Sequence, residues 1–114
     1  MKNFLYNWTN FVNFLSFSSI YVAFIFFNIS KNFKVTRYHS LVISNENLPN
    51  DLNVDAYSED NVIMSISHKI HPIFGVQFHP EAVLTENGFD LIQNFINICD
   101  LFHKARFKYY ENNN

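Results

Sequence analysis

Cysteine and glycine are scarce in this 114-residue sequence, and the cysteine shortage excludes particular kinds of site. The single cysteine, Cys99, rules out an intramolecular disulfide and a zinc site built from several cysteines. Nothing in the sequence therefore requires an oxidising compartment. The two glycines, Gly75 and Gly88, both lie in the second half of the chain, and there are only three prolines.

Charge is also limited, which argues against nucleic acid as a partner. The formal net charge is −2, only 16% of residues are charged, and no basic stripe or acidic tail is present. The length and the 48% hydrophobic content allow one modest core, so we expect a single small domain. The 14 Phe, six Tyr and many Asn are typical of AT-rich coding, as in organellar genomes.

The first 27 residues differ from the rest. Phe11 to Phe27 carries no charge, and a membrane helix needs about 17 to 20 predominantly apolar residues, so this run lies at the lower limit. The same run fits the apolar region of a signal sequence that begins at Lys2, or a buried helix. We favour a fourth interpretation, in which residues 1–27 form an apolar, helix-like segment that is foreign to the domain, so a membrane anchor is not favoured.

From Phe33 onward the pattern predicts a compact mixed domain. Strand formers and period-two alternation are separated by clusters of turn residues, and Thr85 offers a helix cap. The predicted elements are a strand within 35–44, a loop at 45–51, a hairpin of 52–57 and 62–67 with its turn at 58–61, a strand at 73–78, and a final helix after Thr85.

The spacing of apolar residues predicts which faces are buried. Leu52, Val54 and Ala56 share one face of the first hairpin strand, and a polar tail occupies 104–114. The final helix carries an apolar stripe that we expect to pack on the core, composed of Ile92, Phe95, Ile96, Cys99 and Phe102.

The stretch from Gly75 to Glu81 carries the clearest chemical signal. Its histidine and carboxylate, His79 and Glu81, are two positions apart, so an extended backbone places both side chains on the same side. We therefore expect Glu81 to hydrogen-bond one ring nitrogen of His79 and leave the other free to exchange a proton. Pro80 cannot donate to a sheet, so it predicts that the strand ends here. This pair supplies a base and its orienting carboxylate but no nucleophile.

His68 and His71 lie close enough in sequence to raise the question of a metal site with His79 and Glu81. These two histidines flank a turn, and no cysteine assists them, so exposed or packing histidines are the favoured interpretation. We expect neither a metal nor an organic cofactor.

Several separated motifs resemble one family in their order and approximate spacing. The chain resembles the carboxyl-terminal part of a class I glutamine amidotransferase, above all the small subunit of anthranilate synthase or of aminodeoxychorismate synthase. The resemblance runs from about Phe27 to Phe102 and rests on Val35-Thr36-Arg37-Tyr38-His39-Ser40-Leu41-Val42, Asp55-Ala56-Tyr57-Ser58-Glu59-Asp60, Ile63-Met64-Ser65-Ile66-Ser67-His68, Gly75 to Glu81, and Leu84-Thr85-Glu86-Asn87-Gly88.

The resemblance implies a fold and a reaction. The fold is the later part of a doubly wound, flavodoxin-like α/β domain, with a β-hairpin and a final helix, in residues 28–103. In the family a cysteine attacks glutamine, and the released ammonia passes to a large chorismate-aminating synthase subunit. His79 is implied as the general base and acid and Glu81 as its orienting partner, while Ser40 and Leu41 contact bound glutamine. Anthranilate, and hence tryptophan biosynthesis, is favoured over aminodeoxychorismate and folate.

One departure from the family is as informative as the match. The family's nucleophile lies in a Gly-x-Cys-x-Gly turn upstream of the Arg-Tyr-His-Ser-Leu motif, and no such turn exists in these residues. Cys99, on the predicted apolar stripe, is expected to be a buried packing residue. We therefore expect the isolated chain to be inactive. The alternatives are a non-catalytic interaction protein, with or without a membrane tether, and a truncated gene product. The expected location is the cytoplasm or the plastid stroma, or a membrane if Phe11 to Phe27 inserts.

Overall fold

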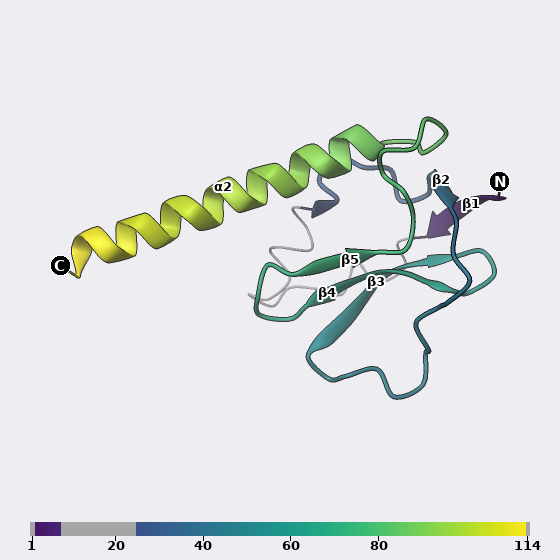
Figure 1. Cartoon of the computed structure of the whole chain (residues 1–114), viewed down its shortest axis with the longest axis horizontal. Helices are drawn as coiled ribbons and strands as arrows, with labels where there is room; N and C mark the ends of the chain where they lie inside the picture. Colours follow the sequence, from purple (N-terminus) through teal and green to yellow (C-terminus); the bar gives the residue numbers. More distant parts are fainter. Residues whose placement is uncertain (1, 8–24, 114) are drawn as a thin grey trace.

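The structure is a computed structural model that describes residues 2–7 and 25–113. Within these residues a five-stranded sheet is followed in sequence by one long helix (Figure 1). The strands lie in the order β2-β1-β3-β4-β5, and neighbouring strands are all antiparallel. The sheet of the described residues therefore lacks the parallel pairs of the expected doubly wound fold. The elements are β1 (Lys2–Asn7), β2 (Lys34–Arg37), β3 (Leu52–Ser58), β4 (Ile63–His68), β5 (Phe74–Val76) and α2 (Gly88–Asn112).

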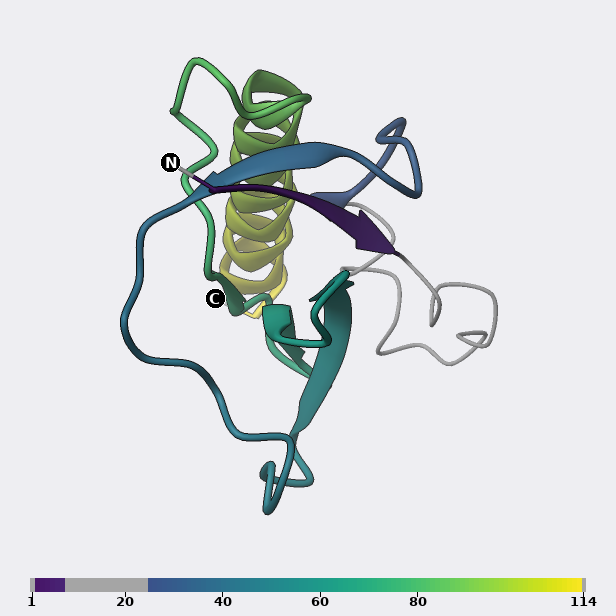
Figure 2. The ribbon, with the colours of Figure 1, turned by 90° about the vertical axis from the view of Figure 1, so that its right-hand side faces the viewer.

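The strand β1 joins two parts of the sheet. Residues Lys2 to Leu5 pair with β2, and Tyr6 and Asn7 pair with the end of β3. Figure 2 shows β1 alongside β2. We predicted no strand here from the sequence, because these residues fall in the segment assigned outside the domain. Most of the apolar run predicted from Phe11 to Phe27 lies outside the described residues. Within residues 2–7 and 25–113, no helix is long and apolar enough to span a membrane.

The hairpin of β3 and β4 confirms the prediction from sequence. Its turn contains Asn61 in a left-handed conformation, with a φ of 62°. The Asp60 carboxylate accepts hydrogen bonds from the Ser58 hydroxyl and, at 2.8 Å, from the Arg37 guanidinium. These hydrogen bonds, that from Ser58 above all, lower the pKa of Asp60. The Arg37 contact ties the tip of the hairpin to β2.

The buried face of β3 differs from the predicted one. Asn53, Asp55 and Ala56 are buried, whereas Leu52 and Val54 are only half-buried. The pairing of β3 with β4 shifts register around Ala56, and such an irregularity breaks the strict alternation on which the prediction depended. The hydroxyls of Ser67 and Ser65 donate to the two Asp55 oxygens, at 2.9 and 3.5 Å.

Two strands are shorter than predicted. The strand β2 ends at Arg37, and the predicted strand residues beyond it form a loop in which the Nδ1 atom of His39 contacts the Leu41 carbonyl at 2.8 Å. This local hydrogen bond turns the backbone away from an extended conformation. The strand β5 ends at Val76, although the Gln77 amide still donates to the Met64 carbonyl of β4 at 2.8 Å.

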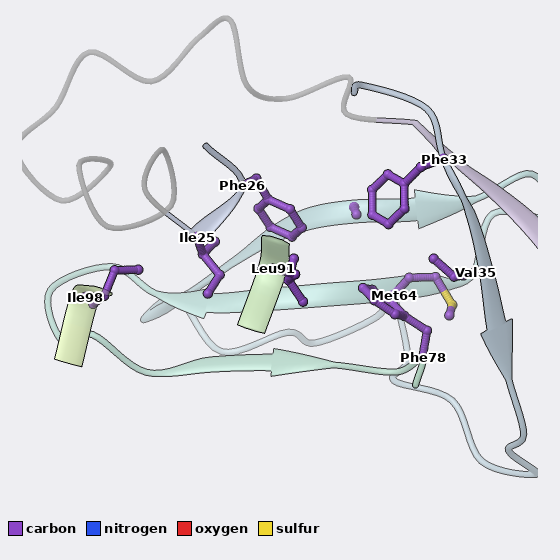
Figure 3. Close-up of a cluster of buried hydrophobic side chains, with 9 residues drawn as sticks. Ile25, Phe26, Phe33, Val35, Met64, Phe78, Leu91 and Ile98 are labelled. Atoms are coloured by element: carbon purple, nitrogen blue, oxygen red, sulfur yellow. The ribbon is translucent and has the colours of Figure 1, made fainter. Parts of the chain in front are cut away.

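The core lies between the sheet and the first turns of α2 (Figure 3). Phe33 and Phe78 meet edge to face with their ring centroids 6.0 Å apart, and Val35 and Ile63 are fully buried. Ile25 and Phe26, which the sequence pattern placed in the N-terminal segment, also pack here. The cluster comprises Ile25, Phe26, Phe33, Val35, Ala56, Met64, Phe78, Leu91 and Ile98.

The helix α2 contacts the domain mainly through residues outside the predicted stripe, although Phe95 of that stripe meets Phe74 of β5 edge to face, with ring centroids 6.4 Å apart. Leu91 and Ile98 are buried, and between them the Asn94 amide donates to the carbonyls of Ile25 and Phe27. This contact leaves the predicted stripe partly exposed, with Phe95 at 45%, and Cys99 is exposed. Beyond Ile98 the helix projects from the domain and continues to Asn112, through the predicted polar tail (Figure 1). Lys, Ala and Arg favour helix there, and no Gly or Pro stops it.

Asparagine occupies the left-handed backbone positions of the described residues. The non-glycine residues with a positive φ are Asn28, Asn47, Asn61 and Asn87, and neither glycine has a positive φ. Among ordinary residues asparagine tolerates this conformation best, because its short side chain bonds locally. Asn87 precedes α2 directly, where the sequence had predicted Thr85 as the cap, and its side chain makes no capping hydrogen bond.

Burial of Asp55 predicts a stability that falls as pH rises. Desolvation raises the pKa of Asp55 from 3.8 to about 6, although the two serine hydrogen bonds oppose the shift. Because the folded state holds this proton more tightly than the unfolded state, about 3 kcal/mol of stability is lost between pH 4 and pH 6. We expect Asp55→Asn to be more stable than the parent at pH 7.5 and nearly equal to it at pH 4, measured by urea unfolding. Asp100→Asn, at an exposed position, controls for the lost charge, and a pH-independent difference for Asp55→Asn would contradict the prediction.

Candidate active site

His79 and Glu81 form the contact that their spacing predicts. The Nδ1 atom of His79 lies 2.9 Å from an oxygen of Glu81, and both side chains are open to solvent, at 43% and 67% exposure. This hydrogen bond is the main cause of a lowered pKa for Glu81, so the carboxylate is ionised at neutral pH. An ionised carboxylate only accepts, so Nδ1 must donate. In the neutral ring Nε2 then carries the lone pair that can take a proton.

The backbone of His79 is held against β2. Its amide donates to the Thr36 carbonyl at 2.9 Å. The Thr85 hydroxyl donates to the His79 carbonyl at 2.6 Å and accepts from the Thr36 amide at 3.0 Å. Thr85 therefore bridges the histidine and the strand. This engagement of its hydroxyl also explains why Thr85 does not cap α2.

Glu86 extends the same attachment toward the start of β2. Its amide donates to the Lys34 carbonyl at 2.8 Å, and its carboxylate accepts from the Lys34 amide at 2.9 Å. The strand β2 thus has bonded neighbours on both edges, β1 on one and parts of residues 79–86 on the other. The His-Pro-Glu segment is consequently fixed by a strand that lies far from it in sequence.

The N-terminus of α2 fixes the segment from another side. Gly88 is buried against Pro80, and a Cβ atom built at this glycine would lie 1.8 Å from the Pro80 carbonyl oxygen. Real Cβ atoms do not approach so closely, so the site requires a residue without a side chain. The helix can therefore begin beside His79 and Glu81 only because position 88 is glycine.

A surface pocket adjoins the loop that follows β2. It has a volume of about 400 Å³, and the predicted substrate-binding residues Ser40 and Leu41 line it together with Gln77. The Nε2 atom of His39, also in its wall, is buried and has no hydrogen-bond partner among the described residues. At the start of this loop the Tyr38 ring meets the His79 ring edge-on, with their centroids 5.6 Å apart. The loop and the His79 pair are thus neighbours.

Cys99 lies far from this pair. Gly88 contacts Pro80, and Cys99 is eleven positions further along α2, or about 16 Å at 1.5 Å per residue. The expectation that Cys99 is buried in the core was wrong, because the buried positions of this part of α2 are Leu91 and Ile98. Its exposure does not make it a nucleophile for His79, which needs a partner within about 3 Å.

His68 and His71 lie at the connection between β4 and β5. The Nδ1 atom of His68 accepts hydrogen bonds from the backbone amides of Ile70 and His71, and the two imidazole centroids are 4.7 Å apart. Within residues 2–7 and 25–113, no group of three or more His, Cys, Asp or Glu side chains is arranged to hold a metal ion. His68 therefore shapes the connection between β4 and β5.

Comparison with known proteins identifies the family. Residues 14–99 match the family described as glutamine amidotransferase class-I. The chain belongs to this family. The match begins before the boundary that we drew at residue 28 and includes the whole His79 site.

Two curated relatives each match about two thirds of this chain. Anthranilate synthase component 2 of Saccharolobus solfataricus is 53% identical over 74 residues, which are 64% of this chain and 37% of that protein. Aminodeoxychorismate synthase component 2 of Klebsiella aerogenes is 45% identical over 73 residues, or 64% of this chain and 39% of that protein. The chain therefore spans less than half of the length of these two relatives.

A solved structure shares the architecture. A protein of Thermoplasma acidophilum that is described as part of a GMP synthase superposes with a TM-score of 0.67 at 34% identity, covering 72% of this chain and 40% of that one. The small antiparallel sheet and final helix are therefore part of a class I amidotransferase fold. The similarity to components of different synthases identifies the domain but not the product.

The close contact between Gly88 and Pro80 predicts that alanine at position 88 destabilises the protein. Glycine to alanine ordinarily stabilises a helix by about 1 kcal/mol, but here the new methyl group must displace the Pro80 carbonyl. We expect Gly88→Ala to lower the free energy of unfolding by about 1–3 kcal/mol, measured by denaturant titration. Gly75→Ala is the matched control, because its methyl group meets only the flexible Ile66 side chain, at 3.2 Å. Equal stability of Gly88→Ala and the parent would disprove the contact.

Proposed function

We propose that this chain contributes the proton-transferring half of a glutamine-hydrolysing site. The observation that carries the proposal is the contact between His79 and Glu81, on a fixed backbone, in a member of the class I amidotransferase family. His79 is proposed as general base and acid, and Glu81 as the group that orients it. Neither role needs a metal or an organic cofactor.

The geometry suggests how the pair acts. With Nδ1–H donated to Glu81, Nε2 faces the reaction as a base, and the ionised carboxylate stabilises the imidazolium that forms. Nε2 takes the proton of the attacking thiol, and the sulfur adds to the side-chain amide carbon of glutamine. The imidazolium then protonates the amide nitrogen, which leaves as ammonia. Nε2 of His79 then deprotonates a water molecule, which attacks the thioester and releases glutamate.

Glutamine is proposed to bind beside Ser40 and Leu41. These residues line a pocket of about 400 Å³ that is large enough for an amino acid, and backbone groups of this loop can contact the substrate carboxylate and amide. Tyr38 links the loop to the His79 ring, so the substrate amide would lie near Nε2. The proposal therefore joins two neighbouring features in one site.

The nucleophile is proposed to lie outside these 114 residues. The sequence contains no Gly-x-Cys-x-Gly turn, and Cys99 is about 16 Å along α2 from the residue that contacts Pro80. A second polypeptide, or residues continuous with this chain, would supply the cysteine. The ammonia acceptor is proposed to be a large chorismate-aminating subunit, with anthranilate favoured over aminodeoxychorismate because the Saccharolobus relative is the more similar of the two.

A complementation experiment tests the proposal. The chain is mixed or co-expressed with an amino-terminal fragment of a class I amidotransferase that carries the Gly-x-Cys-x-Gly turn, and glutamate release is measured. We expect no glutaminase activity from the chain alone and activity from the pair. His79→Ala should lower kcat by about 10²- to 10⁴-fold, because it removes the proton-transfer group.

Cys99→Ala is the matched control in the same assay, and the assembled enzyme should keep its activity. Glutaminase activity of the isolated chain that disappears in Cys99→Ala would overturn the proposal, because it would make Cys99 the nucleophile.

A protein-interaction role is the second candidate, and the exposed apolar side chains of α2 favour it. Phe89, Phe95, Phe102 and Phe107 are all at least 45% exposed on this helix. In that case Phe102→Ser would abolish function in the cell while His79→Ala would not. Location in the cytoplasm or plastid stroma is proposed for both roles, and release from a cell lysate without detergent is the expected result of fractionation.

A further inference from the structure

The proposed mechanism assigns no role to Thr85, although its hydroxyl makes two hydrogen bonds beside His79. This hydroxyl donates to the His79 carbonyl at 2.6 Å and accepts from the Thr36 amide at 3.0 Å, although 49 positions separate Thr85 from Thr36. One oxygen thus connects the backbone of the histidine to the strand that leads into the Ser40–Leu41 loop. We propose that Thr85 is the positioning residue that aligns His79 with Glu81 and with the substrate pocket, an inference that rests on the proposed function.

The first step concerns the His79 carbonyl. The Glu81 side chain is exposed and reaches His79 across only one intervening residue, Pro80. The direction of the His79 carbonyl defines the peptide plane that leads to Pro80 and so sets where Glu81 begins. Movement of that plane by about 1 Å would carry Glu81 beyond the range of 2.7–3.2 Å that a hydrogen bond requires.

The second step concerns β2. The Thr36 carbonyl accepts from the His79 amide, while the Thr36 amide donates to Thr85. Thr36 is therefore attached to the histidine directly on one side and through Thr85 on the other. Two residues beyond Thr36, Tyr38 contacts the His79 ring, and the pocket residues follow. A substitution at Thr85 should therefore change the geometry of both the His79–Glu81 pair and the pocket.

The third step concerns chemistry. A hydroxyl can donate and accept at once, and both roles are used here. Valine has the same shape as threonine but can do neither, whereas serine retains both hydrogen bonds and lacks only a methyl group. These two replacements separate the hydrogen bonds from the packing of the side chain.

The experiment reads the ring of His79 directly in the full chain. Imidazole nitrogen shifts measured by ¹H–¹⁵N NMR, above the pH at which the ring becomes neutral, distinguish the Nδ1–H from the Nε2–H tautomer. In the parent we expect Nδ1–H, because Glu81 accepts from it. In Thr85→Val we expect this preference to be lost, with the Nε2–H form appearing, and in Thr85→Ser we expect it to be restored.

Thr36→Val is the matched control, because it removes a threonine hydroxyl from the same hydrogen-bonded segment. The Thr36 Oγ1 atom is buried and has no hydrogen-bond partner among the described residues, so the tautomer of His79 should remain that of the parent. A purely structural role for Thr85 predicts lower stability with an unchanged tautomer in Thr85→Val. That result would overturn the inference.

A measurement on the parent covers the case in which Thr85→Val does not fold. A hydroxyl proton held in a 2.6 Å hydrogen bond should exchange slowly enough with water to give its own NMR signal, unlike that of the exposed Ser30. Rapid exchange at Thr85 would overturn the inference. Glutamine hydrolysis by the complemented enzyme remains a separate test, so a normal tautomer response without activity would count against the proposed function alone.

Discussion

The attachment of residues 79–86 to β2 is the constraint on which the rest of the site depends. Through its Thr36 and Lys34 backbone groups the strand holds the His-Pro-Glu segment at one end and Glu86 at the other. After Val76 the Gln77 amide still donates to the Met64 carbonyl of β4, and from His79 onward the bonds to β2 direct the chain. The exposed contact between His79 and Glu81 contributes little stability of its own, as is usual for surface pairs. The backbone must therefore create the geometry that the side chains use.

The same arrangement explains why the core and the site are inseparable. Phe78, the residue before His79, is buried against Phe33. Pro80, the residue after His79, lies against Gly88, the first residue of α2. The His-Pro-Glu segment thus runs between a core residue and a helix terminus. A rigid scaffold below an exposed polar pair is the usual way in which proteins place reactive groups precisely in solvent.

Local sequence predicted those features that depend on neighbouring residues. The hairpin followed from alternation and turn residues at 58–61. The contact of His79 with Glu81 was predicted from a spacing of two in an extended backbone, and it forms although Pro80 and Glu81 lie in a turn. Features that depend on distant residues could not be predicted in this way. Thr85 has the side chain of a helix cap, but β2 engages its hydroxyl. At the register shift near Ala56, Asp55 and Ala56 are both buried while Val54 is only half-buried. The stripe of α2 was only partly right, because Phe95 meets Phe74 but the closest contacts are those of Leu91, Ile98 and the Asn94 amide.

The left-handed asparagines show that glycine meets two different demands in proteins. At Asn28, Asn47, Asn61 and Asn87 the backbone needs only a positive φ, and a short polar side chain satisfies it at a small energetic cost. At Gly88 the backbone angle is ordinary, but no space exists for any side chain. A chain with few glycines can therefore build its turns from asparagine, but it cannot do so where two backbones touch. Gly88, a glycine without a positive φ in such a chain, thus indicates a close contact between two backbone segments.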